Sequence, residues 1–302
     1  MRISTSMIYE HLTDSVSRNM EDLKQTQAQM SAGKKYTKPS EAADVVGRVQ
    51  SIESRIKTLE ADFDAVVRTK VGVTAQSNAL EVAAGVMDRL KEISFQASND
   101  PLSAPILASL SAEVTSLKRS LIDIANTRDS NDRYIFAGLR SNEIPYVVKA
   151  DGSVTYEGST TPLRIRVGDV SYEDASVAGP SVWKSVPRGA SSISFFAALT
   201  EFEKALKDNT LAGRRQALAD VEAMSNTVAV AVARSGGVEE RLKLAEEQAQ
   251  ETAARAKSVL SEFKDLDYAE AVATLERREL LLQASQSLIG RLSRLSLLEY
   301  IR

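Results

Sequence analysis

The fold is decided near the end of the chain, by the stretch Leu281-Leu-Gln-Ala-Ser-Gln-Ser-Leu-Ile-Gly-Arg-Leu-Ser-Arg-Leu295. Leucines recur there at spacings of seven, four and three residues, and a second row repeats at sevens. The rows are Leu281, Leu288, Leu292 and Leu295, and Leu275, Leu282 and Ile289. Such spacings place apolar side chains on one broad stripe of an α-helix. Because chain ends usually fray unless they are held, we expect this stripe to pack against another segment or another chain.

The first 70 residues contain a matching apolar pattern. Ile8, Leu12, Val16, Met20 and Leu23 step by four, four, four and three, and Val45, Val49, Ile52, Ile56, Leu59, Phe63 and Val66 alternate fours and threes. The second run is a heptad seam, in which Lys70 and Ser77 are later polar positions that either set helix register or are exposed. We expect the two ends of the chain to pair. The alternative is an ordinary helix bundle whose ends happen to be helical.

Composition excludes several classes of protein. The 302 residues are 43% hydrophobic but only 5% aromatic, as in long helices rather than β-sandwiches. A net charge of −3 gives no case for nucleic-acid binding, and the absence of cysteine excludes disulfides, thiolate catalysis and Cys-ligated metals. Neither a signal peptide nor an apolar run long enough for a transmembrane helix occurs, so we expect no membrane insertion.

The pattern predicts a mainly α fold, a long antiparallel helical bundle or coiled coil formed by the N- and C-terminal segments, with a small inserted β-rich domain. Residues 1–140 are the N-terminal helical part, with helices over about 1–33 and 41–96 and a third that ends near 128–132. Residues 191–302 are the C-terminal helical part, which we expect to pair with it. Breaks are expected in this part at 208–213, 235–237 and 265–267.

Residues 141–190 differ in composition from the rest. They hold four of the seven prolines, five of the fourteen glycines and the only tryptophan, Trp183. Val154–Tyr156 and Leu163–Val167 alternate like strands, and Ala150–Ser153 resembles a hairpin turn. We interpret this segment as a small outer domain with a core largely its own. Trp183 is either a residue of that core or a contact to a neighbouring subunit.

No active site is found in the sequence. His11 is the only histidine and has no thiol or second histidine to work with. Phosphate-binding and nucleophile motifs are absent, and the acidic pairs fall on helix faces expected to be exposed. Arg277 and Arg278 are flanked by Glu276 and Glu279 and are interpreted as self-neutralised. We therefore expect no catalysis, no cofactor and no metal.

Several blocks carry a resemblance to a known family. They are Arg2–Thr5 with Tyr9, Gln29–Lys34 with Lys38–Ser40, Asp132-Arg-Tyr-Ile-Phe-Ala-Gly138, Tyr156–Gly158, Asp265–Glu270 and Ser296–Ile301. In order and spacing the chain resembles the bacterial flagellin superfamily, and within it the hook-associated members that join hook to filament. Glu41–Asp44 departs from the family pattern, which commonly has another proline there.

The resemblance implies a secreted structural protein of the bacterial flagellum. It implies export through the flagellar type III apparatus with an export chaperone, and assembly with copies of itself as a ring. The neighbours implied are hook-associated protein 1 on the hook side and flagellin on the filament side. The alternatives are flagellin itself, as the filament subunit, and more distantly an intracellular coiled-coil scaffold.

The apolar rows predict which residues form the assembly interface. They are Ile8, Leu12, Val16, Leu23, Leu281, Leu288, Leu292, Leu295 and Leu298. In a monomer whose terminal stripes lack their full partners, we expect protease to remove roughly the first 40 and last 40 residues before the middle.

Overall fold

A computed structural model describes residues 5–38, 40, 43–98, 102–166, 172–174 and 176–300, and the side chains of all of these except residues 5, 6, 8, 9, 173 and 292–300. The chain forms two compact units, a terminal unit of residues 1–59 and 252–302 and a central unit of residues 60–251. Two long helices, α2 (Ala43–Ser98) and α6 (Leu211–Lys264), contribute residues to both units.

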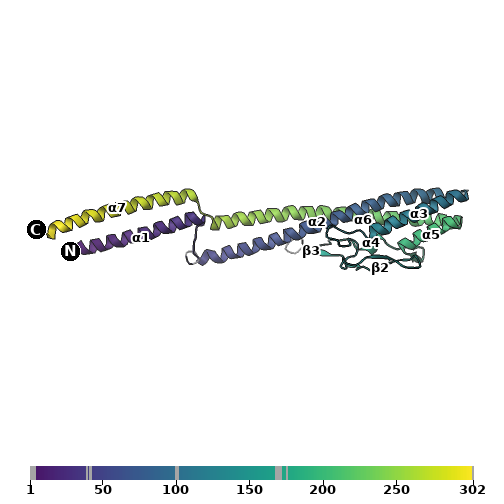
Figure 1. The fold of residues 1–302 in the computed structure, drawn as a ribbon, viewed down its shortest axis with the longest axis horizontal. Helices are drawn as coiled ribbons and strands as arrows, with labels where there is room; N and C mark the ends of the chain where they lie inside the picture. The colour runs from purple at the N-terminus through teal and green to yellow at the C-terminus, as the bar shows by residue number, and fades with distance from the viewer. Residues whose placement is uncertain are drawn as a thin grey trace. The chain divides into compact units, whose positions relative to one another are not determined.

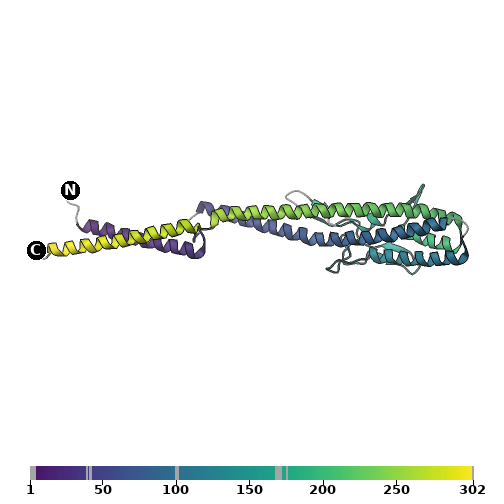
Figure 2. The same cartoon turned by 90° about the horizontal axis from the view of Figure 1, so that it is seen from above.

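The terminal unit pairs the two ends of the chain, as the sequence predicted. Helix α1 (Thr5–Ala32) runs beside α7 (Tyr268–Tyr300) in both views of Figures 1 and 2. Helix α1 ends at Gly33, whose φ of 65° is the left-handed conformation that favours glycine after a helix. The break predicted at 265–267 also exists, since α6 ends at Lys264 and α7 begins at Tyr268.

In the central unit, α2 and α6 pack along the predicted heptad seam. Polar pairs interrupt the apolar contacts of this seam: Lys70 Nζ lies 2.7 Å from Glu246 Oε2, and Ser77 Oγ lies 2.9 Å from Ser235 Oγ. Between them, Thr74 donates to Glu239 at 2.7 Å. The polar positions in the seam are therefore partnered across the helix pair, and each partner fixes the register of the two helices.

The break predicted at Ser235–Gly237 is wrong, because α6 continues through it. Ser235 is fully buried against α2, and Val238 and Leu242 in the next turn are buried as well. Packing of this face against α2 outweighs the low helix propensity of two successive glycines.

The main core joins four helices. Helix α3 (Ala104–Ala125) and helix α5 (Phe195–Lys207) pack beside α2 and α6 (Figure 1). Helix α3 ends earlier than predicted, because Asn126 exchanges two hydrogen bonds with the backbone of Tyr146, at 2.8 and 2.9 Å. Its side chain thereby anchors the start of the β-rich segment to the end of the helix.

In the residues that the structure describes, the β-rich segment has three separate antiparallel hairpins and one short helix. The elements are β1 (Tyr146–Val148) with β2 (Val154–Tyr156), β3 (Arg164–Arg166) with β4 (Tyr172–Asp174), α4 (Gly179–Val182), and β5 (Val186–Arg188) with β6 (Ser191–Ile193). The predicted turn joins β1 to β2, closed by a bond from Lys149 N–H to Ser153 O of 2.8 Å.

The expectation that this segment has its own core is wrong. Trp183 is 5% exposed, and its ring packs edge-on against Phe136 and Phe195, with Phe196 close by. These residues belong to one cluster with the buried faces of α2, α3, α5 and α6. Two-stranded hairpins cannot bury enough apolar surface by themselves, so they pack against the helices. Trp183 is thus a core residue of the central unit.

The block Asp132–Gly138 is the backbone hub that holds the β1–β2 hairpin and α4. Phe136 O accepts the Gly179 N–H at 2.9 Å and the Tyr156 hydroxyl at 3.1 Å. Ala137 O accepts the Ser159 N–H at 2.9 Å. Burial raises the pKa of Tyr156 to about 12, so its hydroxyl remains a donor at neutral pH.

Gln76 fastens this hub to α2. Its side chain is buried and donates to Ile135 O at 3.2 Å and Val177 O at 2.9 Å, and it accepts the Val177 N–H at 3.0 Å. One amide in the helix seam therefore satisfies three backbone groups from two irregular segments. Buried backbone groups need such partners, since water cannot reach them.

Gln76→Leu should destabilise the central unit, because it leaves these three backbone groups without partners. At about 1–3 kcal/mol for each buried unsatisfied group, we expect a loss of about 3 kcal/mol or more. Urea unfolding followed by Trp183 fluorescence measures it. Asn78→Leu, the same change on the exposed face of α2, is the control. Equal stability of the two variants would contradict the role of Gln76.

Gly138→Ala should be far more damaging than Gly152→Ala. Both glycines have a positive φ, 59° and 79°. An added Cβ would lie 2.3 Å from Ser159 O at Gly138 but meets nothing within 4 Å at Gly152. Gly152→Ala should cost about 1–2 kcal/mol for its backbone conformation alone. Gly138→Ala must also displace the chain at Ser159, so urea unfolding should show at least twice that loss.

Candidate assembly surface

Two blocks of the sequence meet where the terminal helices are joined to the long ones. Lys35 N–H donates to Lys264 O at 2.9 Å, and Leu266 N–H donates to Gly33 O at 3.1 Å. The Tyr268 hydroxyl donates to Met30 O at 3.0 Å. The blocks Gln29–Lys34 and Asp265–Glu270 are thus bound to each other through their backbones.

An ion pair closes the same junction from the side of α2. Lys264 Nζ lies 2.6 Å from Glu53 Oε1, and the hydrogen bond and charge of Lys264 lower the pKa of Glu53. A lowered carboxyl pKa favours the folded form at neutral pH, and this contribution is lost as the pH falls through the folded-state pKa, below the ordinary value of 4.5. Because both side chains are solvent-exposed, the contribution is small.

The contact between α1 and α7 uses only part of the predicted stripe. On α1, Leu12, Val16 and Leu23 are partly buried, and on α7 the row Leu275, Leu282 and Ile289 is partly buried. Apolar side chains that recur at spacings of three, four and seven residues lie on the face of a helix that packs against a partner helix. The row that repeats at sevens in α7 therefore faces α1.

The other row of α7 is left uncovered. Leu281 is 49% exposed and Leu288 is 50% exposed, although both belong to the predicted assembly interface. Leu280, which the sequence analysis did not select, is 66% exposed beside them. The side chains of the remaining predicted residues, Ile8, Leu292, Leu295 and Leu298, lie outside the described residues. Pairing within the chain thus leaves an apolar face on α7.

Arg278 was interpreted as neutralised by its neighbours in sequence, and that interpretation is wrong. Its guanidinium reaches across to α1, where it donates to Thr26 Oγ1 at 2.6 Å and to Asp22 O. Arg278 stands three residues after Leu275 and four before Leu282, so the helical period placed it on the inner row. That spacing was the signal that could have identified it.

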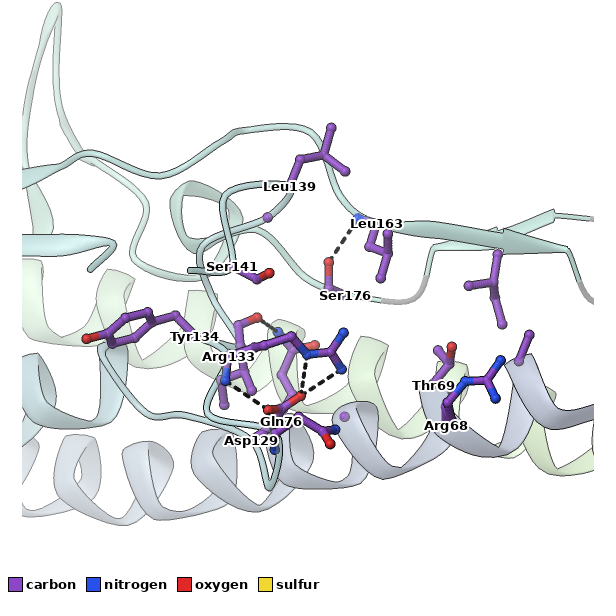
Figure 3. Close-up of a pocket in the computed structure, with 16 residues that line it drawn as sticks. Arg68, Thr69, Gln76, Asp129, Arg133, Tyr134, Leu139, Ser141, Leu163 and Ser176 are labelled. Atoms are coloured by element: carbon purple, nitrogen blue, oxygen red, sulfur yellow. Dashed lines mark hydrogen bonds and ion pairs between the residues drawn. The ribbon is translucent and has the colours of Figure 1, made fainter. Parts of the chain in front are cut away.

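A separate pocket of about 570 Å³ lies in the central unit, between α2, the hub and β3. In Figure 3, Gln76, Asp129 and Arg133 lie together on one side of the pocket, and Leu139 and Leu163 are drawn above them. Burial acts to raise the pKa of Asp129, but hydrogen bonds from Arg133 and Asn131 outweigh it, and the net pKa is lowered. Its carboxylate is thus tied to the loop and is no general base.

Other kinds of site lack support in the described residues. Among them, acidic and histidine side chains nowhere gather in a group able to hold a metal ion. None of the helices searched combines the length and apolar character required to cross a bilayer. His11 is exposed on α1. The arrangement that remains is a pair of terminal helices with an uncovered leucine face.

Comparison with known proteins shows which protein family the sequence matches. The model of the bacterial flagellin N-terminal helical region matches residues 3–141, and that of the C-terminal helical region matches residues 218–301. The first match contains α1, α2, α3 and the hub, and the second contains most of α6 and all of α7. Together they span most of the chain.

Named relatives and solved structures agree with these matches. Flagellar hook-associated protein 3 of Escherichia coli K12 is 25% identical over 77% of this chain and 72% of its own length. The protein of the same name from Salmonella typhimurium is 26% identical over 63% of this chain and 59% of its own length. The crystal structure of flagellar hook-associated protein 3 from Legionella pneumophila has the same fold, with a TM-score of 0.66 at 16% identity over 71% of this chain and 98% of that chain. The chain described here belongs to the bacterial flagellin family.

Proposed function

We propose that this chain is a structural subunit of the bacterial flagellum that joins the hook to the filament and provides the platform on which flagellin assembles. The observation that carries a structural role is the leucine face of α7, which remains exposed after α1 has paired with it. An exposed apolar face of this kind marks a surface for another protein. The names of its relatives, which are hook-associated proteins, support a place at the flagellar hook.

The proposal includes the neighbours of the subunit. Copies of the chain form a ring, hook-associated protein 1 lies on the hook side and flagellin lies on the filament side. The chain reaches this place outside the cell unfolded, through the flagellar type III export apparatus and with the help of an export chaperone. The residues proposed for assembly are the exposed leucines of α7, Leu280, Leu281 and Leu288. Ile8, Leu292, Leu295 and Leu298 are retained from the sequence prediction, whereas Leu12, Val16 and Leu23 belong to the contact between α1 and α7.

A second candidate is the filament subunit itself, since the matching family models are those of flagellin. Deletion of the gene separates the two. Loss of a junction subunit should leave hooks on the cells and release unassembled flagellin into the medium. Loss of a sole flagellin would leave hooks with no flagellin in the medium, and unchanged filaments would contradict both functions.

Leu281→Asp and Leu288→Asp should block assembly without unfolding the monomer. Both side chains are about half exposed, so the change in unfolding free energy should stay within about 0.5 kcal/mol. Burying the new carboxylate against a neighbouring subunit costs several kcal/mol and should lower incorporation at least tenfold. Circular dichroism reports the fold, and immunolabelling of isolated hooks reports incorporation.

Gln283→Asp supplies the matched control, because it adds the same charge at an exposed polar position of the same helix. This variant should assemble normally. If both leucine variants also assembled as the wild type does, the leucine face would not be an assembly surface.

A further inference from the structure

The described glycines fall into two groups with different physical reasons for their presence. Seven of them cannot be replaced without strain. Gly33, Gly138, Gly152 and Gly189 have a positive φ, and a Cβ at Gly158, Gly179 or Gly213 would lie less than 3 Å from another atom. In each case the local structure requires the absence of a side chain.

The other six lie inside the long helices and have no such reason. They are Gly47, Gly72 and Gly85 in α2, Gly236 and Gly237 in α6, and Gly290 in α7. A Cβ at five of these positions would meet no atom within 4 Å, and at Gly237 it would only touch Arg241 at 3.7 Å. Alanine would fit at all of them, and each glycine weakens its helix relative to alanine.

The positions of these glycines do not form a docking stripe. Helices that approach one another closely place small residues on one face, at spacings such as four or seven. Gly72 and Gly85 are thirteen residues apart, which turns them about 220° from each other around α2 at 100° per residue. Gly236 and Gly237 are adjacent and point in different directions. Gly72 also lines the pocket beside the hub, so its role there is not separable from the pocket.

We propose that the helix-interior glycines are a device that keeps α2, α6 and α7 weak in the isolated chain, so that it unfolds readily. Gly47, Gly85, Gly236 and Gly290 carry this role most clearly, because nothing surrounds them. The weakness acts on the backbone of each helix and leaves its buried face unchanged. The inference rests on the proposed function, in which the subunit leaves the cell unfolded and gains its final stability from its neighbours.

The test compares two variants of the full chain, each with four substitutions in α2, α6 and α7. The first carries Gly47→Ala, Gly85→Ala, Gly236→Ala and Gly290→Ala. The second makes the opposite change at exposed alanines of the same helices, Ala61→Gly, Ala229→Gly, Ala254→Gly and Ala284→Gly. Each alanine gained should raise the folded-to-unfolded ratio about two- to fivefold, and each alanine lost should lower it by a similar factor. Urea unfolding and hydrogen exchange measure this in the purified monomers.

Export is then measured in the bacterium from pulse-labelled protein in the medium. The alanine variant should be exported several times more slowly than the wild type, and the glycine variant no more slowly than the wild type. Equal export of a demonstrably more stable alanine variant overturns the inference, as does an alanine variant that is no more stable. Normal export followed by failed incorporation overturns it too, and assigns the glycines to contacts with a neighbour.

The proposed function has its own control in this experiment. Wild-type chain supplied from a plasmid must restore filaments in the deletion strain. If it does not, the proposed function fails whatever the alanine variant does. If it does, the export rates of the two variants decide the inference alone.

Discussion

The antiparallel packing of α2 on α6 is the interaction on which the rest of the central unit depends. Apolar contacts alone would tolerate sliding of two such long helices, because one heptad resembles the next. The pairs Lys70–Glu246, Thr74–Glu239 and Ser77–Ser235 are satisfied in only one register. A shift of one turn would break all three pairs and leave the buried Ser235 hydroxyl without its partner, at a cost of about 1–3 kcal/mol for that group. The register in turn fixes the position of Gln76 along the helix pair, and hence the position of the hub that Gln76 binds.

The hub is the segment through which the irregular β-rich region is hydrogen-bonded to the helices. The backbone of 135–137 offers carbonyl groups to Gln76, Tyr156, Gly179 and Ser159, so α2, the β1–β2 hairpin and α4 are tied to the same short segment. Aromatic packing of Trp183 against Phe136 and Phe195 then covers it. The hairpins gain from the helices the buried area that they could not provide themselves. Insert and helices are therefore one cooperative structure.

The terminal unit differs from the central unit, because part of its apolar surface remains exposed after its two helices have paired. The apolar stripe of α7 is wider than a single partner helix can cover. It consists of two neighbouring rows of leucine and isoleucine, and the two rows together span more than one contact face. Helix α1 takes the row of Leu275, Leu282 and Ile289, with Arg278 bound to the α1 backbone in the same row. Leu281 and Leu288 face outward. The monomer is thus folded and incomplete at the same time, which suits a subunit whose stability is to be shared with neighbours.

The sequence by itself determined the helices and their pairing, because helical period and residue type are local properties. It placed the seam of α2, the end of α1 at Gly33 and the turn between β1 and β2 correctly. Only the tertiary structure decided which leucine row faces inward, because two rows of equal apolarity differ only in what lies opposite them. The same holds for Ser235–Gly237, where burial against α2 overrode local propensity, and for Trp183, whose partners lie on a helix beyond the insert. Contacts between residues distant in sequence settle such questions, and no local pattern records them.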